Sequence, residues 1–366
     1  MIAGIRRAGV CVLAGVVMVL AGVRPAAADN IRDREWHLGA LRIPEAHQIS
    51  QGEGVVVGLP DTGVDTKHAE LDGALLPGKG FGEGNGDFDG RGDFIGHGTA
   101  MAGLIAGRGL PGNGGVLGIA PKAMILPLQT LRNENGSGNA AYLAAGIDWA
   151  VEHDAKVICI AGGTGRDSRV RAAVERALRS DVVVVAAVGN TSTEHAVSFP
   201  ANIPGVLAVG GTDRDGNHAS ISVTGPEIMI VAPAVDIVST RLSGEYASAT
   251  GTSDATAIVA GVVALVRARY PKLSGAEVVH RITATAVDKG KPGRDDEFGF
   301  GIVDPVAALT ADVGPVAGSP AASPGTATPG KHEPGGSGVT WALAGGGVAL
   351  LVAVMVVVWR RRRARR

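Results

Sequence analysis

Three short segments carry an aspartate, a histidine and a serine in settings where each could take part in catalysis. Asp61 follows the apolar run Val55–Leu59, and the carboxyl ends of parallel strands are where many α/β folds build their sites. His97 lies between two glycines, small neighbours that let an imidazole approach other groups closely. Ser253 precedes the apolar helical stretch Ala255–Arg269, where free backbone N–H groups and the helix dipole favour negative charge. Together they could supply an orienting carboxylate, a base and a nucleophile.

Each segment also has an ordinary structural explanation. An Asp-Thr-Gly after a strand is usually a turn, a histidine between glycines is often a loop residue, and Thr-Ser before a helix is usually a cap. Taken singly, these explanations are favoured, whereas the combination favours catalysis. Gly189 and Asn190 add a turn after a valine-rich run, and the side-chain amide of Asn190 could donate a hydrogen bond to an oxyanion.

Alternating strand and helix patterns between residue 53 and about residue 310 must position these side chains. Strands are predicted at 54–59, 124–128, 156–160, 182–187 and 206–209, and helices at 97–106, 139–152 and 169–179. Strand–helix–strand alternation and valine-rich runs are typical of a buried parallel sheet. The sequence therefore predicts an α/β fold with a central, mainly parallel sheet. Residues 29–52 form a short N-terminal extension, with Trp36 and Leu38 as its expected anchors on the surface of the following domain.

The first 28 residues have the pattern of an export signal. Arg6 and Arg7 precede an apolar stretch that ends near residue 23, and the small residues Ala26–Ala28 offer a cleavage site after Ala28. A retained anchor is the alternative. Cys159 would be the one cysteine left after cleavage, so no intrachain disulfide is expected.

The C-terminal end of the chain is predicted to cross a membrane. Residues 311–338 are rich in Pro, Gly and Ala and have the composition of a linker. Residues 339–359 contain no charged residue, and a helix of that length spans roughly 30 Å, the thickness of a bilayer core. Six arginines follow in the tail 360–366, which predicts a cytoplasmic C-terminus and places the domain at 53–310 outside the cell.

The charge of the exported part argues against nucleic acid as a partner. Nine arginines and no acidic residue lie in 1–28 and 339–366, so residues 29–338 carry a net charge of −10 although the whole chain carries −1. An acidic surface repels phosphate backbones. We therefore expect that nucleic acid is not a partner.

The catalytic segments, taken in order, resemble those of the subtilisin-like serine protease family. The resemblance covers residue 54 to about residue 309 and rests on VVVGLPDTGVD, GHGTAMAGLIAG, ATGTSDATAIVAG and the asparagine at 190. It implies a three-layer fold and a serine endopeptidase with the triad Asp61, His97 and Ser253. It also implies that Asn190 binds the oxyanion and that four residues contact substrate: Ala161, Gly162, Gly163 and Gly189.

Within the family, the chain is similar to mycosins, the membrane-anchored proteases of actinobacterial type VII secretion systems. The signal sequence, the Trp36-His37-Leu38 segment, the missing large propeptide and the C-terminal apolar segment carry this resemblance. It implies partners among type VII secretion subunits. It also leaves an alternative open, in which the protein is a membrane-bound structural subunit of a secretion complex and proteolysis is dispensable.

The chain departs from the family pattern beside the site. Asp254 follows the serine where methionine is common, and Ala161–Gly163 replaces the Ser-Leu-Gly that pairs with substrate backbone. No cofactor is expected. The family allows calcium, but Asp87, Asp89 and Asp93 resemble only half of a calcium loop, because glycine stands at its twelfth position.

Overall fold

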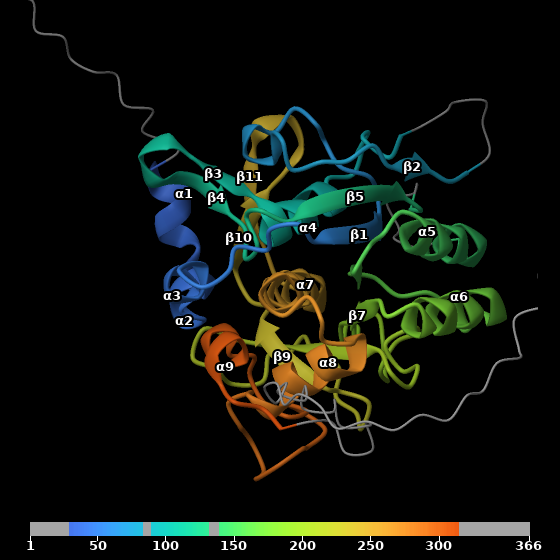
Figure 1. The fold of residues 1–366 in the computed structure, drawn as a ribbon, viewed down its shortest axis with the longest axis vertical. Helices are drawn as coiled ribbons and strands as arrows, with labels where there is room; N and C mark the ends of the chain where they lie inside the picture. The colour runs from blue at the N-terminus through green and yellow to red at the C-terminus, as the bar shows by residue number, and fades with distance from the viewer. Residues whose placement is uncertain (1–28, 83–88, 132–138, 315–366) are drawn as a thin grey trace, which may run out of the picture. The chain divides into compact units, whose positions relative to one another are not determined.

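A parallel sheet of seven strands forms the centre of the computed structural model, which describes residues 29–82, 89–131 and 139–314. Its order is β2-β5-β1-β6-β7-β8-β9 (Figure 1). The strands are β1 (Val56–Asp61), β2 (Lys79–Gly80), β5 (Met124–Gln129), β6 (Val157–Ile160), β7 (Val183–Ala187), β8 (Leu207–Thr212) and β9 (Ile230–Pro233). The α/β class and the parallel sheet are thereby confirmed, with predicted strand ends within three residues of those observed.

Alternating side chains of the strands fill two separate cores, one on each face of the sheet. In β7, Val183 and Val185 point to one core, while Val184 and Ala186 point to the other. The first face is covered by α4 (His97–Ala106), α7 (Thr252–Arg269), α8 (Gly275–Ala284) and α9 (Pro305–Thr310), and the second by α5 (Ala140–Glu152) and α6 (Ser168–Arg179). Figure 1 shows α7 end-on near the centre, with α5 and α6 together at the right. The result is a three-layer arrangement.

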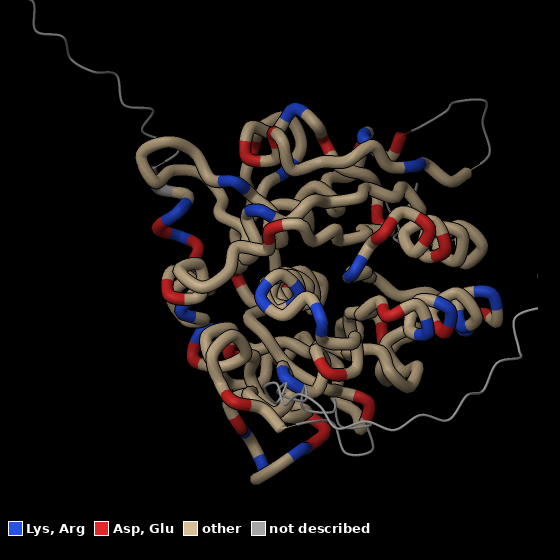
Figure 2. The backbone as a smooth tube through the Cα atoms, viewed as in Figure 1, with Lys and Arg blue, Asp and Glu red and all other residues tan. Residues whose placement is uncertain are grey.

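Charged residues are nearly excluded from the sheet. Asp61 is the single Lys, Arg, Asp or Glu in β1 and β5–β9, and most charges lie on outer helices and loops (Figure 2). A lone carboxylate in such a setting is costly unless it has a partner. The residue before it, Pro60, has no backbone N–H to donate. Because β1 pairs with β6 only at Val57 and Gly58, the missing donor lies beyond the hydrogen bonds that join these two strands.

The N-terminal extension is folded onto the same core as α7. It contains three short helices, α1 (Asp29–Arg34), α2 (Trp36–Ala40) and α3 (Ile43–His47), which the sequence did not predict. Leu38, Leu41 and Ile43 are buried in the core on the α7 face, and the Trp36 indole donates a hydrogen bond of 3.2 Å to the carbonyl of Val235. The extension therefore contributes to the stability of the domain.

The remaining described elements are small. They are two hairpins, β3 (Arg108–Leu110) with β4 (Gly114–Leu117) and β10 (Ile237–Thr240) with β11 (Tyr246–Ala249), and the 3₁₀ turns η1 (Ala69–Leu71), η2 (Pro111–Asn113) and η3 (Leu242–Gly244). Within the described ranges, no helix has the length and apolar character to cross a bilayer. The segments 1–28 and 315–366, which include the expected signal, most of the linker and the expected membrane span, lie outside those ranges.

Candidate active site

Asp61 and His97 meet at the end of β1. The Asp61 side chain is 1% exposed, and its Oδ1 and Oδ2 lie 2.8 and 2.9 Å from Nδ1 of His97. The backbone N–H of Thr62 also donates to Oδ1, at 2.7 Å. A carboxylate can only accept, so Nδ1 carries a proton, and in the neutral ring Nε2 is left as the acceptor that a general base requires.

Asp93 fixes the start of the helix that carries His97. Its Oδ1 accepts from the backbone N–H groups of Ile95 and Gly96, and its Oδ2 accepts from the N–H of Thr99 at 3.0 Å. These bonds satisfy donors that a helix start leaves without partners. The sequence reading considered Asp93 only as part of a calcium loop. An aspartate just before a helical pattern is a capping signal and could have identified this role.

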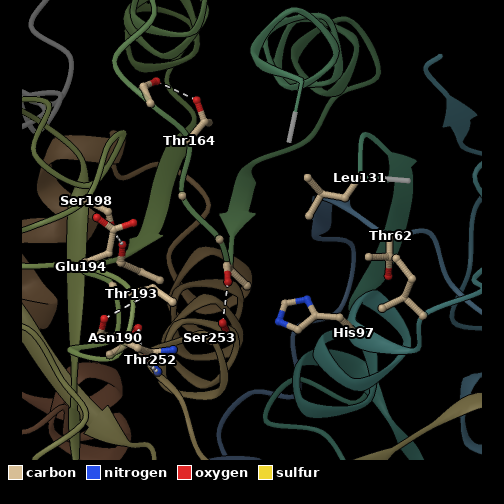
Figure 3. A pocket seen from close by; sticks show the side chains of 17 residues that line it. Thr62, His97, Leu131, Thr164, Asn190, Thr193, Glu194, Ser198, Thr252 and Ser253 are labelled. Atoms are coloured by element: carbon tan, nitrogen blue, oxygen red, sulfur yellow. Dashed lines mark hydrogen bonds between the residues drawn. The ribbon is translucent and has the colours of Figure 1, made fainter. Parts of the chain in front are cut away.

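Ser253 lies in the first turn of α7, in the same cleft as His97. Its hydroxyl donates a hydrogen bond of 2.6 Å to the carbonyl oxygen of Ala161, and no hydrogen bond joins it to His97 among the described contacts. In Figure 3 the Ser253 side chain points along its hydrogen bond, and the His97 ring lies beside it without a bond between the two. Rotation about the Cα–Cβ bond of Ser253 would turn the hydroxyl toward His97.

Asn190 and the first turn of α7 offer two hydrogen-bond donors beside Ser253. Oδ1 of Asn190 accepts from the backbone N–H of Thr252 at 3.0 Å and from its hydroxyl at 3.2 Å. Because the N–H can only donate, this contact fixes the amide orientation and leaves Nδ2 to donate elsewhere. The backbone N–H of Ser253 likewise has no acceptor among the described contacts. A developing oxyanion could take both donors.

A cleft of about 590 Å³ brings the predicted substrate-binding residues together. Its lining includes His97, Asn190 and Ser253, and also the four predicted substrate contacts Ala161, Gly162, Gly163 and Gly189. No residue of 29–52 is among those that line it in the described part of the chain. The N-terminal extension therefore packs on the domain without filling this cleft.

Two ionisable groups beside Ser253, His97 and Asp254, have shifted pKa values. Burial by itself lowers the pKa of His97, but the charge of Asp61 and its hydrogen bond outweigh this effect and raise the pKa to about 9. The negative charges of Asp254 and Asp93 act in the same direction. Burial raises the pKa of Asp254 to about 7, although the charges of His97 and Arg241 oppose the shift. The His97 side chain remains 33% exposed to the cleft, so water and substrate can reach it.

The described residues contain no group of three His, Cys, Asp or Glu side chains that could hold a metal ion. Asp93 is committed to the backbone of α4 and to the Thr99 hydroxyl, and Asp87 lies outside the described ranges. Cys159 is fully buried in β6, and burial raises its thiol pKa, as for a small apolar core residue.

Comparison with known proteins places this geometry in a family. The model of the subtilase family matches residues 52–301. The thermostable alkaline protease of Halalkalibacterium halodurans is 38% identical over 270 residues, which cover 73% of this chain and 71% of that protein.

Solved structures show the same likeness in three dimensions. MycP1 from Mycobacterium smegmatis is 30% identical, with a TM-score of 0.69 over 78% of this chain and 87% of that one. A second structure of MycP1, a serine protease described as an essential component of the type VII (ESX-1) secretion system, is 34% identical. Its TM-score is 0.66, over 77% of this chain and 89% of that one.

Proposed function

Because this chain belongs to the subtilase family of serine peptidases, we propose that Asp61, His97 and Ser253 are its catalytic triad. The observation that carries the proposal is the pair of contacts between Asp61 and Nδ1 of His97, which places the proton of the neutral ring on Nδ1, so that Nε2 can act as a base in the cleft that holds Ser253. Members of this family hydrolyse peptide bonds in protein substrates, and we propose the same reaction for this chain.

The first half of the reaction forms an acyl-enzyme. The Ser253 hydroxyl leaves Ala161, gives its proton to Nε2 of His97, and its oxygen bonds to the substrate carbonyl carbon. Nδ2 of Asn190 and the N–H of Ser253 donate to the oxyanion that forms. When the C–N bond breaks, His97 returns the proton to the departing amine. Asp61 stays ionised and stabilises the imidazolium.

The second half regenerates the enzyme. A water molecule gives a proton to Nε2 of His97 and its oxygen bonds to the acyl carbon. The same two donors hold the second oxyanion. Collapse of this intermediate breaks the ester bond, releases the acid, and returns the proton to Ser253. Gly163 and its neighbours in the cleft lining supply the surface along which the peptide would lie.

We also propose that the protease domain faces the outside of the cell, held by a single C-terminal span at 339–359, and that it serves type VII secretion. The apolar segment, the six arginines and the export signal support the topology. The likeness to MycP1 supports the association with secretion. A reporter fused after Arg366 should be cytoplasmic, and protease added outside cells should cut within 311–338. A reporter found outside would contradict this topology.

A strain that carries Ser253→Ala separates catalysis from a purely structural role. The proposal predicts that exported substrates lose their processed N-termini while the amount of membrane-bound protein stays normal. Proteomics of the exported fraction, read for new N-termini, makes the measurement. Unchanged processing and unchanged secretion would favour the alternative, a structural subunit whose proteolysis is dispensable.

A further inference from the structure

Glu194 is held over the cleft by a tight turn that begins at the proposed oxyanion residue. The backbone N–H groups of Thr193 and Glu194 both donate to the carbonyl of Asn190, at 2.9 and 2.8 Å. The chain therefore folds back over Gly189, which has a positive φ of 100°. A Cβ on Gly189 would lie 2.9 Å from Cγ of Glu194 and 2.7 Å from Oγ of Ser198. Glycine at 189 is thus what lets the Glu194 side chain lie against the cleft floor.

The carboxylate of Glu194 has no countercharge. It is half-buried, and no hydrogen bond or ion pair to it occurs in the described part of the chain. It is the one acidic residue among the described residues that line the cleft, and no Lys or Arg is among them. A carboxylate without a partner in this setting gains most from a cation brought in by a ligand.

The position of Glu194 relative to Ser253 indicates which part of a substrate would meet it. In Figure 3, His97 lies on one side of Ser253, and Glu194 lies on the other side, next to Ser198 and above Asn190. When the substrate carbonyl carbon lies at Ser253 and its oxygen points toward Asn190, the substrate side chain next to that carbonyl is directed away from His97. That side chain belongs to the P1 residue, the residue on the amino side of the cleaved bond.

Glycines make up much of the cleft lining near Glu194. Gly162, Gly163, Gly165 and Gly189 all line the cleft, and none of them has a side chain that would narrow the space for a substrate. From this geometry we propose that Glu194 determines P1 specificity, selecting substrates with Lys or Arg at P1. The proposal rests on the proposed function, because it assumes acylation at Ser253.

The expected size of the preference follows from the chemistry of the pair. A hydrogen bond to a charged group contributes enough free energy to favour Lys over an uncharged side chain of the same shape by roughly 10- to 100-fold. Because Glu194 is only half-buried, added salt should reduce the preference.

Peptide phosphonates that differ only at P1 provide the test, used on the full-length protein in membranes. The informative comparison is between probes with lysine and norleucine at P1, because these side chains match in shape and differ in charge. A probe with glutamate at P1 is added as a third. We expect the lysine probe to label Ser253 at least about tenfold faster than the norleucine probe. Equal rates for the two probes would overturn the proposal.

Variants assign the preference to Glu194. Glu194→Gln should equalise the lysine and norleucine rates, and Glu194→Lys should favour the glutamate probe. Glu152→Gln removes the same charge from the exposed end of α5 and should leave the wild-type order unchanged. A lysine preference that survived in Glu194→Gln would contradict the assignment. If that variant failed to fold, the comparison of the lysine and norleucine probes on the wild-type protein would still test whether the cleft prefers a cation at P1.

The same experiment distinguishes the two proposals. If no probe labels Ser253, the proposed function fails and the specificity proposal fails with it. If all probes label Ser253 at similar rates, the proposed function stands and the specificity proposal fails.

Discussion

The hydroxyl of Ser253 donates to the carbonyl oxygen of Ala161, with 2.6 Å between the two oxygens. In the proposed reaction the same hydroxyl must give its proton to Nε2 of His97. The structure therefore holds the Ser253 hydroxyl in a resting rotamer, in which it is bonded to the segment that should contact the substrate backbone. Catalytic hydrogen bonds often form fully only in the substrate complex, so this arrangement is compatible with an active protease.

The protonation of His97 sets the pH dependence of activity. The sequence alone predicts a midpoint near the ordinary histidine value of ~6.5. In the structure, the charge of Asp61 outweighs the effect of burial and raises the pKa of His97 to about 9. The base works only when neutral, so activity should rise with pH through a single ionisation above 6.5. A profile of kcat/KM between pH 5 and 10 makes the measurement, and a plateau already reached by pH 6.5 would be the opposite result.

Asp254 should tune that ionisation. Its side chain is 3% exposed, and its negative charge raises the pKa of His97. The Asp254→Asn variant keeps the shape and removes the charge, so the midpoint should move to lower pH. Glu152→Gln, at an exposed site on α5, serves as the control. An unchanged midpoint with lowered stability would mean that Asp254 has only a packing role.

Parts of the fold and the site were predictable because their signals are local. The valine-rich runs predicted β6, β7 and β8, since strands buried on both faces have few polar residues. The segment around His97 predicted the bounds of α4 as observed. Asp61, His97 and Ser253 were singled out by residue type and setting, and the fold brings His97 and Ser253 to one cleft with Asp61 buried against His97.

Other features depend on contacts that the sequence does not display. The rotamer of Ser253 is decided by the carbonyl of Ala161, 92 residues away in sequence. The Glu194 side chain reaches the cleft because a turn at Asn190 folds it over Gly189. The helices of 29–52 are short and depend on burial of Leu38 and Ile43 in the main core, since isolated helices of this length are not stable in water.

Asn190→Ala tests the oxyanion site. Removal of Nδ2 should lower kcat by about 10²–10³ with little change in KM, as for other donors that act on the transition state. Steady-state kinetics on one peptide substrate measure both constants. Oδ1 of Asn190 also accepts from Thr252, so a thermal melt should accompany the kinetics. A change confined to KM would mean that Asn190 binds the ground state instead.

His37 should make the domain acid-labile. Its ring is fully buried in α2, neither nitrogen has a described partner, and burial lowers its pKa to about 3. In the unfolded chain its pKa is ~6.5. Because the unfolded state binds the extra proton, the free energy of unfolding should fall as the pH drops below 6.5 toward 3. The slope contributed by this one group is ~1.4 kcal/mol per pH unit.

The His37→Leu variant removes this titration and keeps an apolar side chain in the core. Denaturant unfolding between pH 5 and 7 should show a shallower loss of stability for His37→Leu than for the wild-type protein. His153→Gln, at an exposed position at the end of α5, is the matched control and should follow the wild-type curve. Parallel curves for His37→Leu and wild type would show that His37 does not titrate on unfolding.

The central claim is that Ser253 is the nucleophile of a working protease, and covalent labelling tests it most directly. The full-length protein is incubated with a serine-directed phosphonate, digested, and the modified residue is identified by mass spectrometry, with Ser253→Ala and His97→Ala beside it. The account predicts a single adduct on Ser253, no adduct in Ser253→Ala, and labelling slowed by orders of magnitude in His97→Ala. An adduct on another serine that persists in Ser253→Ala would contradict it.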